Sequence, residues 1–312
     1  SLYELRTLVT RYPYFEGSYA MRGSSVYQQT LNLTISEKQK LRRLLEENYL
    51  PKNRVYRYNF FYDNCTTRAR DIIEKCIEGK VVYSEGKERL SFRDIVHQYT
   101  KGHEWDELGI DMCLGSEADK PIDTRKQMFA PFYMLEAAKK ATIVVGDSVR
   151  PLILHEKKVV DVEPEDVREG FPLSPMVCVF ILIGVTCFVG WLQFKIRKII
   201  WIWDLLLFGV QGLAGCVITF LVFFSTHPTV GSNWLILLLN PIPLIYLPVM
   251  VYRAIKGKKD YYHTINIVCL TSFMMIMPFI QQKFNVTVLP LALCLLICSA
   301  NHVLLYYRQN NK

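Results

Sequence analysis

The first 171 residues lack any apolar run long enough to cross a membrane, and no charged start is followed by an apolar stretch. We therefore expect no signal peptide in this chain, and because residue 1 is Ser, a mature or truncated form. The sequence also lacks a CxxC motif and any His/Cys spacing typical of zinc sites, so it predicts no metal and no cofactor. No run of acidic residues marks an ion or proton pathway, which disfavours a transporter.

Apolar residues are abundant after Phe171. They make up 51% of the 312 residues, and the excess forms five segments, each close to the ~20 residues that a membrane-spanning helix needs. A charged stretch that ends at Gly170-Phe171-Pro172 separates them from the rest. We expect an outer domain at residues 1–171 and a transmembrane domain at residues 172–312, with helices at about 173–194, 199–225, 234–252, 263–282 and 286–307.

Basic residues follow the first, third and fifth segments, whereas residues 226–233 and 281–285 contain only Lys283. By the positive-inside rule the basic loops are cytoplasmic, and an odd number of spans then places the N-terminal domain outside. In a bacterium this predicts a multi-pass protein of the inner membrane with a periplasmic domain. The net charge of +8 follows from this topology and does not indicate nucleic-acid binding.

Within the outer domain the pattern predicts a mixed α+β fold. We expect a helix at residues 36–50 that begins with a Ser36…Gln39 capping box, and a loop at residues 105–123. The other expected elements are strands at 56–61, 80–83 and 142–145 and helices at 91–99 and 128–141.

Several polar residues fall inside the apolar segments. We expect Asp204, Asn301 and His302 to lie at the membrane interface. Residues 240–243 contain Pro241 and Pro243, which must break or kink the third helix. Gln211 and residues 240–243 are candidates for lining a cavity, although interhelical hydrogen bonding explains them equally well.

Cys65 is the candidate nucleophile. An aromatic strand is expected to end at Asp63-Asn64, two favoured N-cap types, and Cys65 then begins a helix. Free backbone N–H groups and the positive end of the helix dipole favour the thiolate there, and the same groups could hold an oxyanion. A lone cysteine is more often a small buried hydrophobe, but the polar neighbours disfavour a core position. These neighbours are Asp63, Asn64, Thr66, Thr67 and Arg68.

Two bonding questions concern the cysteines of the outer domain. Cys65 and Cys76 would lie about 16 Å apart along one helix, so they cannot form a disulfide. A Cys76–Cys113 bridge would leave Cys65 free. The match of residues 64–66 to a glycosylation sequon is treated as chance.

Four stretches of the chain resemble the bacterial Lnb lipoprotein N-acyltransferases. They are residues 28–34, the string Tyr58-Asn59-Phe60-Phe61-Tyr62-Asp63-Asn64-Cys65-Thr66-Thr67-Arg68-Ala69-Arg70-Asp71, residues 109–121 and residues 127–131. The family has a periplasmic domain followed by five transmembrane helices. The resemblance implies an α+β papain-like periplasmic domain of the permuted NlpC type, similar to lecithin:retinol acyltransferase, followed by a five-helix transmembrane α-bundle.

The resemblance implies that Cys65 is the catalytic nucleophile. From their positions around it, we expect Asp63, Asn64, Thr66 and Thr67 to be supporting or oxyanion residues, and Arg68 and Tyr62 to bind substrate. Arg68 could bind phosphate or pair with Asp71 or another local carboxylate. The family's catalytic His lies upstream of the Cys, but residues 1–64 contain no His. We expect the general base to precede residue 1, and not to be His97 or His103.

The implied reaction is acyl transfer through a Cys65 thioester. A membrane phospholipid would donate the acyl chain, and the α-amine of the N-terminal Cys of a diacylated lipoprotein would accept it. One alternative is a membrane-anchored cysteine endopeptidase or amidase acting on peptidoglycan, for which one anchoring helix would suffice. Another is a non-enzymatic transporter or sensor subunit in which Cys65 is structural.

Overall fold

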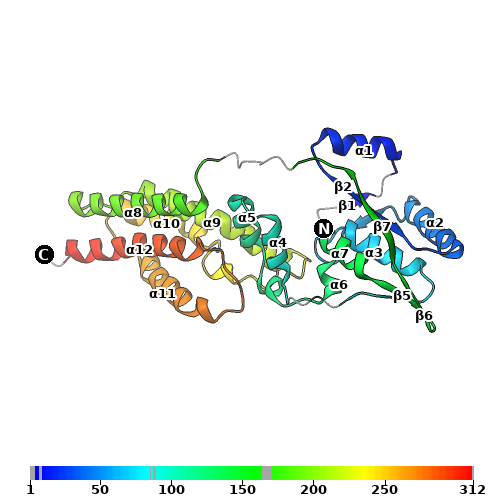
Figure 1. Ribbon diagram of the computed structural model, residues 1–312. Coiled ribbons are helices and arrows are strands. Elements are labelled where there is room, and N and C mark those ends of the chain that lie inside the picture. The colour runs from blue at the N-terminus through cyan, green and yellow to red at the C-terminus, as the bar shows by residue number, and fades with distance from the viewer. Residues whose placement is uncertain (1–3, 7–8, 85, 87–88, 164–170, 311–312) are drawn as a thin grey trace. The chain divides into compact units, whose positions relative to one another are not determined.

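The computed structural model describes residues 4–6, 9–84, 86, 89–163 and 171–310 (Figure 1). The chain forms two compact units: unit 1 contains residues 1–95 and 121–168, and unit 2 contains residues 96–120 and 169–312. The domain boundary expected between residues 171 and 172 stays a prediction. Nothing in the sequence pattern indicated that residues 96–120 group with the C-terminal part.

Unit 1 is a mixed α/β unit. Its strands are β1 (Glu4–Arg6), β2 (Val26–Leu31), β3 (Val55–Arg57), β4 (Lys80–Val82), β5 (Thr142–Val145), β6 (Ser148–Pro151) and β7 (Ile153–Val160). Its helices are α1 (Tyr12–Met21), α2 (Ile35–Tyr49), α3 (Cys65–Cys76), α6 (Thr124–Gln127) and α7 (Pro131–Lys140), and α4 (Phe92–Tyr99) begins in it. The expected fold class is confirmed at this level, whereas the papain-like topology stays a prediction.

The described strands pair only with antiparallel neighbours. β1 pairs with β3, β2 with β7, and β4, β5 and β6 form a three-stranded sheet in that order. A core forms where α3 and α7 pack their apolar faces against the three-stranded sheet of β4, β5 and β6 and the start of β7. Its buried members are Cys76, Ile77, Ala138, Ala141, Ile143, Leu152 and Ile153. This packing fixes α3, and therefore the position of its first residue.

Some boundaries predicted for unit 1 are wrong. The capping box of α2 is formed by Thr34 and Glu37, because each side chain accepts the other's backbone N–H, at 3.2 and 2.8 Å; Ser36 already lies inside the helix. The strand expected at 56–61 ends at Arg57. Beyond it, Asn59 Oδ1 accepts the N–H groups of Phe61 and Tyr62, which turns the chain before α3.

Unit 2 contains five helices long and apolar enough to cross a membrane, counted over the described residues. These spans are α8 (Pro175–Ile196), α9 (Trp201–Phe224), the segment Trp234–Ile255, the segment Tyr261–Phe279 and α12 (Val288–Asn310). The third consists of η2 (Trp234–Leu237) and α10 (Ile242–Ile255), and the fourth of α11 (Tyr261–Ile276) and η3 (Met277–Phe279). The break before α10 is the one that Pro241 and Pro243 predict. The chain is therefore a multi-pass membrane protein.

Much of residues 105–123, where the sequence predicts a loop, is helical. This segment contains most of α5 (Glu104–Cys113) and all of η1 (Ser116–Asp119), and it binds the segments that connect the spans on one side of unit 2. Gly115 N–H donates to Thr229 O at 2.7 Å, and Asn285 donates to Asp111 at 3.0 Å. A side chain at Gly115 would approach the Ser232 backbone to 2.6 Å, so only glycine permits this contact. These tertiary contacts override the turn-rich local sequence.

Two of the polar residues expected at the membrane interface are instead buried in the bundle. Asp204 is 0% and His302 7% exposed, and they bind each other. A charged group inside a bundle is stabilised by a partner on a neighbouring helix, which local sequence does not reveal.

All nine cysteines are free thiols, so no Cys76–Cys113 bridge is present.

Candidate functional site

Cys65 is the first residue of α3, and its side chain is exposed, as the sequence predicts. Asn64 caps the helix: its Oδ1 accepts the backbone N–H groups of Thr66 and Thr67, both at 2.9 Å. Thr67 Oγ1 accepts the Asn64 N–H at 2.8 Å, which completes a capping box. The cap holds the thiol at the positive end of the helix, where a thiolate is stabilised by the helix dipole.

The same cap changes which groups are available for an oxyanion. The N–H groups of Thr66 and Thr67 are occupied by Asn64, so the expectation that the whole first turn offers free donors is wrong. The Cys65 N–H has no hydrogen-bond partner among the described residues. It is therefore the backbone donor nearest to the thiol that can still bind a negative oxygen.

Asn64 is also anchored to a distant part of unit 1. Its Nδ2 donates to Phe60 O at 2.9 Å and to Phe129 O at 2.8 Å. Next to it, the rings of Phe61, Phe92 and Phe129 pack together, with centroids 4.5 to 5.4 Å apart. Asn64 is 5% exposed, so these bonds form in a largely dry environment and fix the orientation of the capping side chain.

Arg68 pairs with a neighbouring carboxylate. Its Nε and Nη2 donate to the two oxygens of Asp63 at 2.7 and 2.8 Å, and its guanidinium lies 3.4 Å from the ring centroid of Tyr56. Of the two roles predicted for Arg68, this geometry favours pairing with a local carboxylate, and the partner is Asp63, whereas Asp71 pairs with Arg70 and Arg125. About a third of the Arg68 side chain stays exposed, so a phosphate could bind only beside Asp63. Tyr62 is exposed and packs edge-on against Phe92.

Two tyrosines that the sequence did not single out are coupled to the thiol. Burial raises the pKa of the Tyr58 phenol, and the negative charge of a Cys65 thiolate raises it further. Burial also raises the pKa of Tyr56, where Arg68 lowers it and Cys65 raises it. Both phenols therefore stay protonated near neutral pH and are able to donate an O–H hydrogen bond. The sequence feature that could have identified these two tyrosines is their place in the aromatic run just before Cys65.

Unit 1 contains one histidine, His155, an exposed residue of β7 that pairs with Thr30 in the sheet register. Among the described residues of unit 1, Cys65 Sγ has one hydrogen-bonding contact, with Thr66 Oγ1 at 4.0 Å. His97 and His103 belong to unit 2. His97 Nε2 lies 2.8 Å from the buried carboxylate of Asp111, and His103 forms no side-chain cap on α5. The identity of the general base stays a prediction.

Unit 2 contains an apolar cavity of about 470 Å³. Residues of α5, α8, α9 and α12 line it, among them Trp105, Leu182, Trp203, Gln211 and Leu295. Gln211 Nε2 donates to Leu238 O at 2.8 Å, so this residue both bonds between helices and lines the cavity. The volume is within the range of small-molecule sites, and the apolar lining suits a hydrocarbon chain.

Comparison with known families agrees with this architecture. Residues 1–101 match the Lnb N-terminal periplasmic domain and residues 166–310 match the Lnb transmembrane domain. No curated protein and no solved structure gives a significant match. The two matches lie in the order and at the places that the exposed Cys65 domain and the five spans occupy, and the chain therefore belongs to the Lnb family.

Proposed function

We propose that this protein is a lipoprotein N-acyltransferase of the bacterial inner membrane that works through a thioester on Cys65. The observation that supports it best is the exposed thiol at the capped start of α3, in a chain that also carries five membrane spans. A nucleophile of this kind divides acyl transfer into two easier steps.

In the first step the Cys65 sulfur attacks the carbonyl carbon of an acyl ester in a membrane phospholipid. A general base takes the thiol proton as the C–S bond forms, and the Cys65 N–H stabilises the oxyanion. The ester C–O bond then breaks, and the base returns the proton to the departing lysophospholipid oxygen. In the second step the α-amine of the N-terminal Cys of a diacylated lipoprotein attacks the thioester. The amide forms, the C–S bond breaks, a general base takes the ammonium proton, and the thiolate is regenerated.

Two further features support lipid substrates. Five spans exceed what anchoring a soluble enzyme requires, and the apolar cavity in unit 2 offers a lining that suits an acyl chain.

Other residues of unit 1 are proposed to assist. Tyr56 and Tyr58 add O–H donors to the site. Arg68 and Tyr62 are proposed to contact the phospholipid headgroup, with Arg68 shared between Asp63 and the phosphate.

The test is N-acylation by the full chain in phospholipid vesicles with a diacylated lipopeptide acceptor, followed by mass spectrometry of enzyme and product. We expect a fatty-acyl adduct on Cys65 and N-acylated lipopeptide. Cys65→Ala and Cys65→Ser should both lose transfer, because a hydroxyl is a far poorer nucleophile. Cys113→Ala, which removes a thiol outside unit 1, should retain it.

Three outcomes would contradict the proposal. Undiminished lipopeptide N-acylation by Cys65→Ala removes the nucleophile from the mechanism. Cleavage of peptidoglycan peptides by the wild-type protein, with no acyl adduct, identifies a membrane-anchored endopeptidase or amidase instead. A Cys65 thiol that forms neither adduct nor product indicates a structural role.

A further inference from the structure

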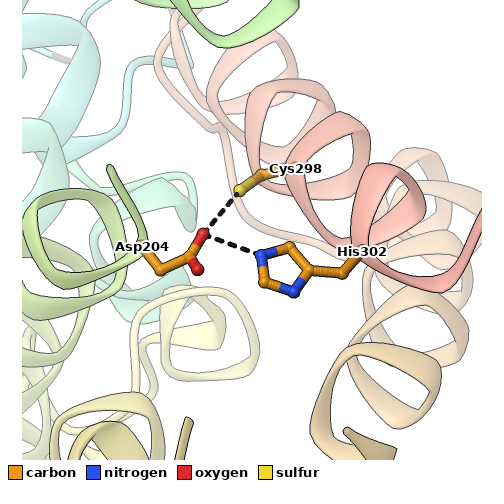
Figure 2. Close-up of side chains that lie close together, drawn as sticks. All are labelled: Asp204, Cys298 and His302. Carbon is orange, nitrogen blue, oxygen red and sulfur yellow. Dashed lines mark hydrogen bonds and ion pairs between the residues drawn. The ribbon is translucent and has the colours of Figure 1, made fainter. Parts of the chain in front are cut away.

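Three side chains that can ligate a metal meet inside the membrane bundle, far along the chain from Cys65. Asp204 is on α9, and Cys298 and His302 are one turn apart on α12 (Figure 2). Asp204 Oδ1 lies 3.6 Å from Cys298 Sγ and 2.9 Å from His302 Nε2. All three residues are at least nine-tenths buried, at 0%, 3% and 7% exposure. We propose that they form a binding site for one divalent transition-metal cation of the zinc class.

The ligand spacing fits tetrahedral coordination. The three ligand atoms lie within 4.8 Å of one another. Ligand–metal distances of about 2.0 to 2.3 Å at tetrahedral angles place neighbouring ligand atoms about 3.3 to 3.5 Å apart. The oxygen–sulfur separation of 3.6 Å and the oxygen–nitrogen separation of 2.9 Å lie on either side of this value, so a cation requires the side chains to adjust. Positions i and i+4 of α12 supply two ligands from one helix face, and α9 supplies the third.

Unsatisfied polar atoms are a second, independent indication. Asp204 Oδ2 is buried and has no hydrogen-bond partner among the described residues. Burying a carboxylate oxygen without a hydrogen-bond partner is unfavourable, because the oxygen loses its hydration and gains nothing in return. His263 Nε2 is likewise buried without a described partner, and the His263 ring stacks on His302 with centroids 3.8 Å apart. A cation at the cluster would bind the carboxylate as a mono- or bidentate ligand.

Charge balance distinguishes a metal site from a hydrogen-bonded cluster. A carboxylate and a thiolate carry two negative charges, which a divalent cation neutralises inside the low-dielectric bundle. Without a cation, the cluster has to hold a charged Asp–His pair, a protonated carboxyl, or a carboxylate whose charge is left unbalanced. The sulfur and imidazole ligands favour zinc over magnesium or calcium, which prefer oxygen. The site was not apparent from the sequence because Asp204 lies 94 and 98 residues before the other two ligands.

His302 also lines a small cleft at the ends of α10, α11 and α12, which gives the site access from outside the bundle. Arg253, Lys258 and Lys259 line the same cleft. Their positive charge opposes the approach of a cation, so we expect slow loading, and the metal content has to be measured after equilibration.

The experiment uses the full chain purified in detergent, with zinc determined by elemental analysis and cobalt as a spectroscopic probe. We expect one zinc per chain and, after cobalt substitution, a thiolate-to-cobalt charge-transfer band. Asp204→Asn, Cys298→Ser and His302→Gln should each lower zinc affinity at least tenfold, and Cys298→Ser should remove the band. Cys294→Ser is the matched control, because Cys294 is buried on the same helix and its sulfur contacts Thr186 at 3.2 Å.

A second measurement covers variants that fail to fold. A chelator should lower the apparent melting temperature of the wild type, since a cation that binds only the folded state stabilises it. The proposal is wrong if the equilibrated wild type holds no more zinc than the Asp204→Asn, Cys298→Ser, His302→Gln triple variant and the chelator leaves its melting temperature unchanged. Equal loss of zinc in Cys294→Ser and Cys298→Ser would also overturn it. Neither result bears on acyl transfer at Cys65.

Discussion

The side-chain amide of Asn64 donates to the carbonyl oxygen of Phe129, 65 residues later in the chain, at 2.8 Å. The same side chain accepts two N–H groups at the start of α3. One residue therefore both begins the helix that presents Cys65 and ties this helix start to the segment before α7.

Substitutions at Asn64 should separate these two tasks. Asn64→Asp keeps the side-chain oxygen that caps α3 but loses both donated bonds, whereas Asn64→Ala loses the side-chain cap and both donated bonds. We expect Asn64→Ala to destabilise unit 1 by about 2 to 4 kcal/mol, from a lost cap and unsatisfied buried carbonyls, and Asn64→Asp by a similar amount, because a carboxylate oxygen then faces both carbonyl oxygens. Asn53→Ala, which removes a surface bond to Glu47 O, is the control and should cost under about 1 kcal/mol. Limited proteolysis of unit 1 at increasing temperature measures the stability of each variant. An equal loss of stability in all three variants would contradict the prediction.

The stability of unit 1 should fall in acid through Glu37. Burial alone would raise the pKa of this carboxyl, but the N–H groups of Thr34 and Glu78 and the Arg150 guanidinium together hold the pKa below its ordinary value. A carboxyl whose pKa is lower in the folded state stabilises the fold above its unfolded pKa, about 4.3, and this contribution is lost as the pH falls further.

We therefore expect the wild type to lose stability between about pH 5 and pH 3 more steeply than Glu37→Gln, which cannot titrate there. The variant should be less stable at pH 7, because Arg150 loses its charged partner. Identical pH profiles for the two proteins would show that Glu37 does not contribute.

Gly215 marks the closest approach of α9 to the segment before α10. A Cβ at this position would lie 2.2 Å from the Asn240 carbonyl carbon, so Gly215→Ala forces the backbones apart. We expect a loss of about 1 to 3 kcal/mol, seen as a lower melting temperature in detergent. Gly209→Ala on the same helix meets only Leu247 Cδ2 at 3.7 Å and should be tolerated. Equal behaviour of the two variants would mean that this contact is not present in the membrane.

The topology predicts opposite signals from two reporter fusions. Gly231 lies in the segment after α9, and Gly257 follows α10, one membrane span later. We expect an enzyme that is active only outside the cytoplasm to work at Gly231 and to fail at Gly257. A cytoplasmic reporter at the same sites is the control and should give the reverse. Equal signals from both sites would show that the spans are miscounted.

His97 should not be the general base. Its Nε2 is engaged with Asp111, which also accepts from Asn285, so the ring holds α4 and α5 to a connecting segment of unit 2. We expect His97→Ala to lower thermal stability but retain most of the N-acylation rate, with His103→Ala as the control that affects neither. Complete loss of transfer in a folded His97→Ala protein would overturn the expectation that the base precedes residue 1.

The sequence by itself determined the features that depend on local pattern. Five apolar segments of bilayer length predicted the five spans. The orientation expected from the asymmetry of Lys and Arg between loops stays a prediction. Asn64 followed by Cys65 predicted a capped helix with the thiol at its start, because N-cap preference is a short-range effect. Pro241 and Pro243 predicted the break in the third span, since proline removes a backbone donor.

Only the tertiary structure decided the features that depend on distant partners. The loop expected at 105–123 is helical because α5 and η1 bind connecting segments more than 100 residues away. Asp204 and His302 are buried because they bind each other in a bundle that excludes water, although they are 98 residues apart in the chain. The Asn64 bond to Phe129 likewise depends on how α3 and α7 pack. A single sequence specifies local backbone preferences directly, whereas pairing between buried polar groups depends on which helices become neighbours.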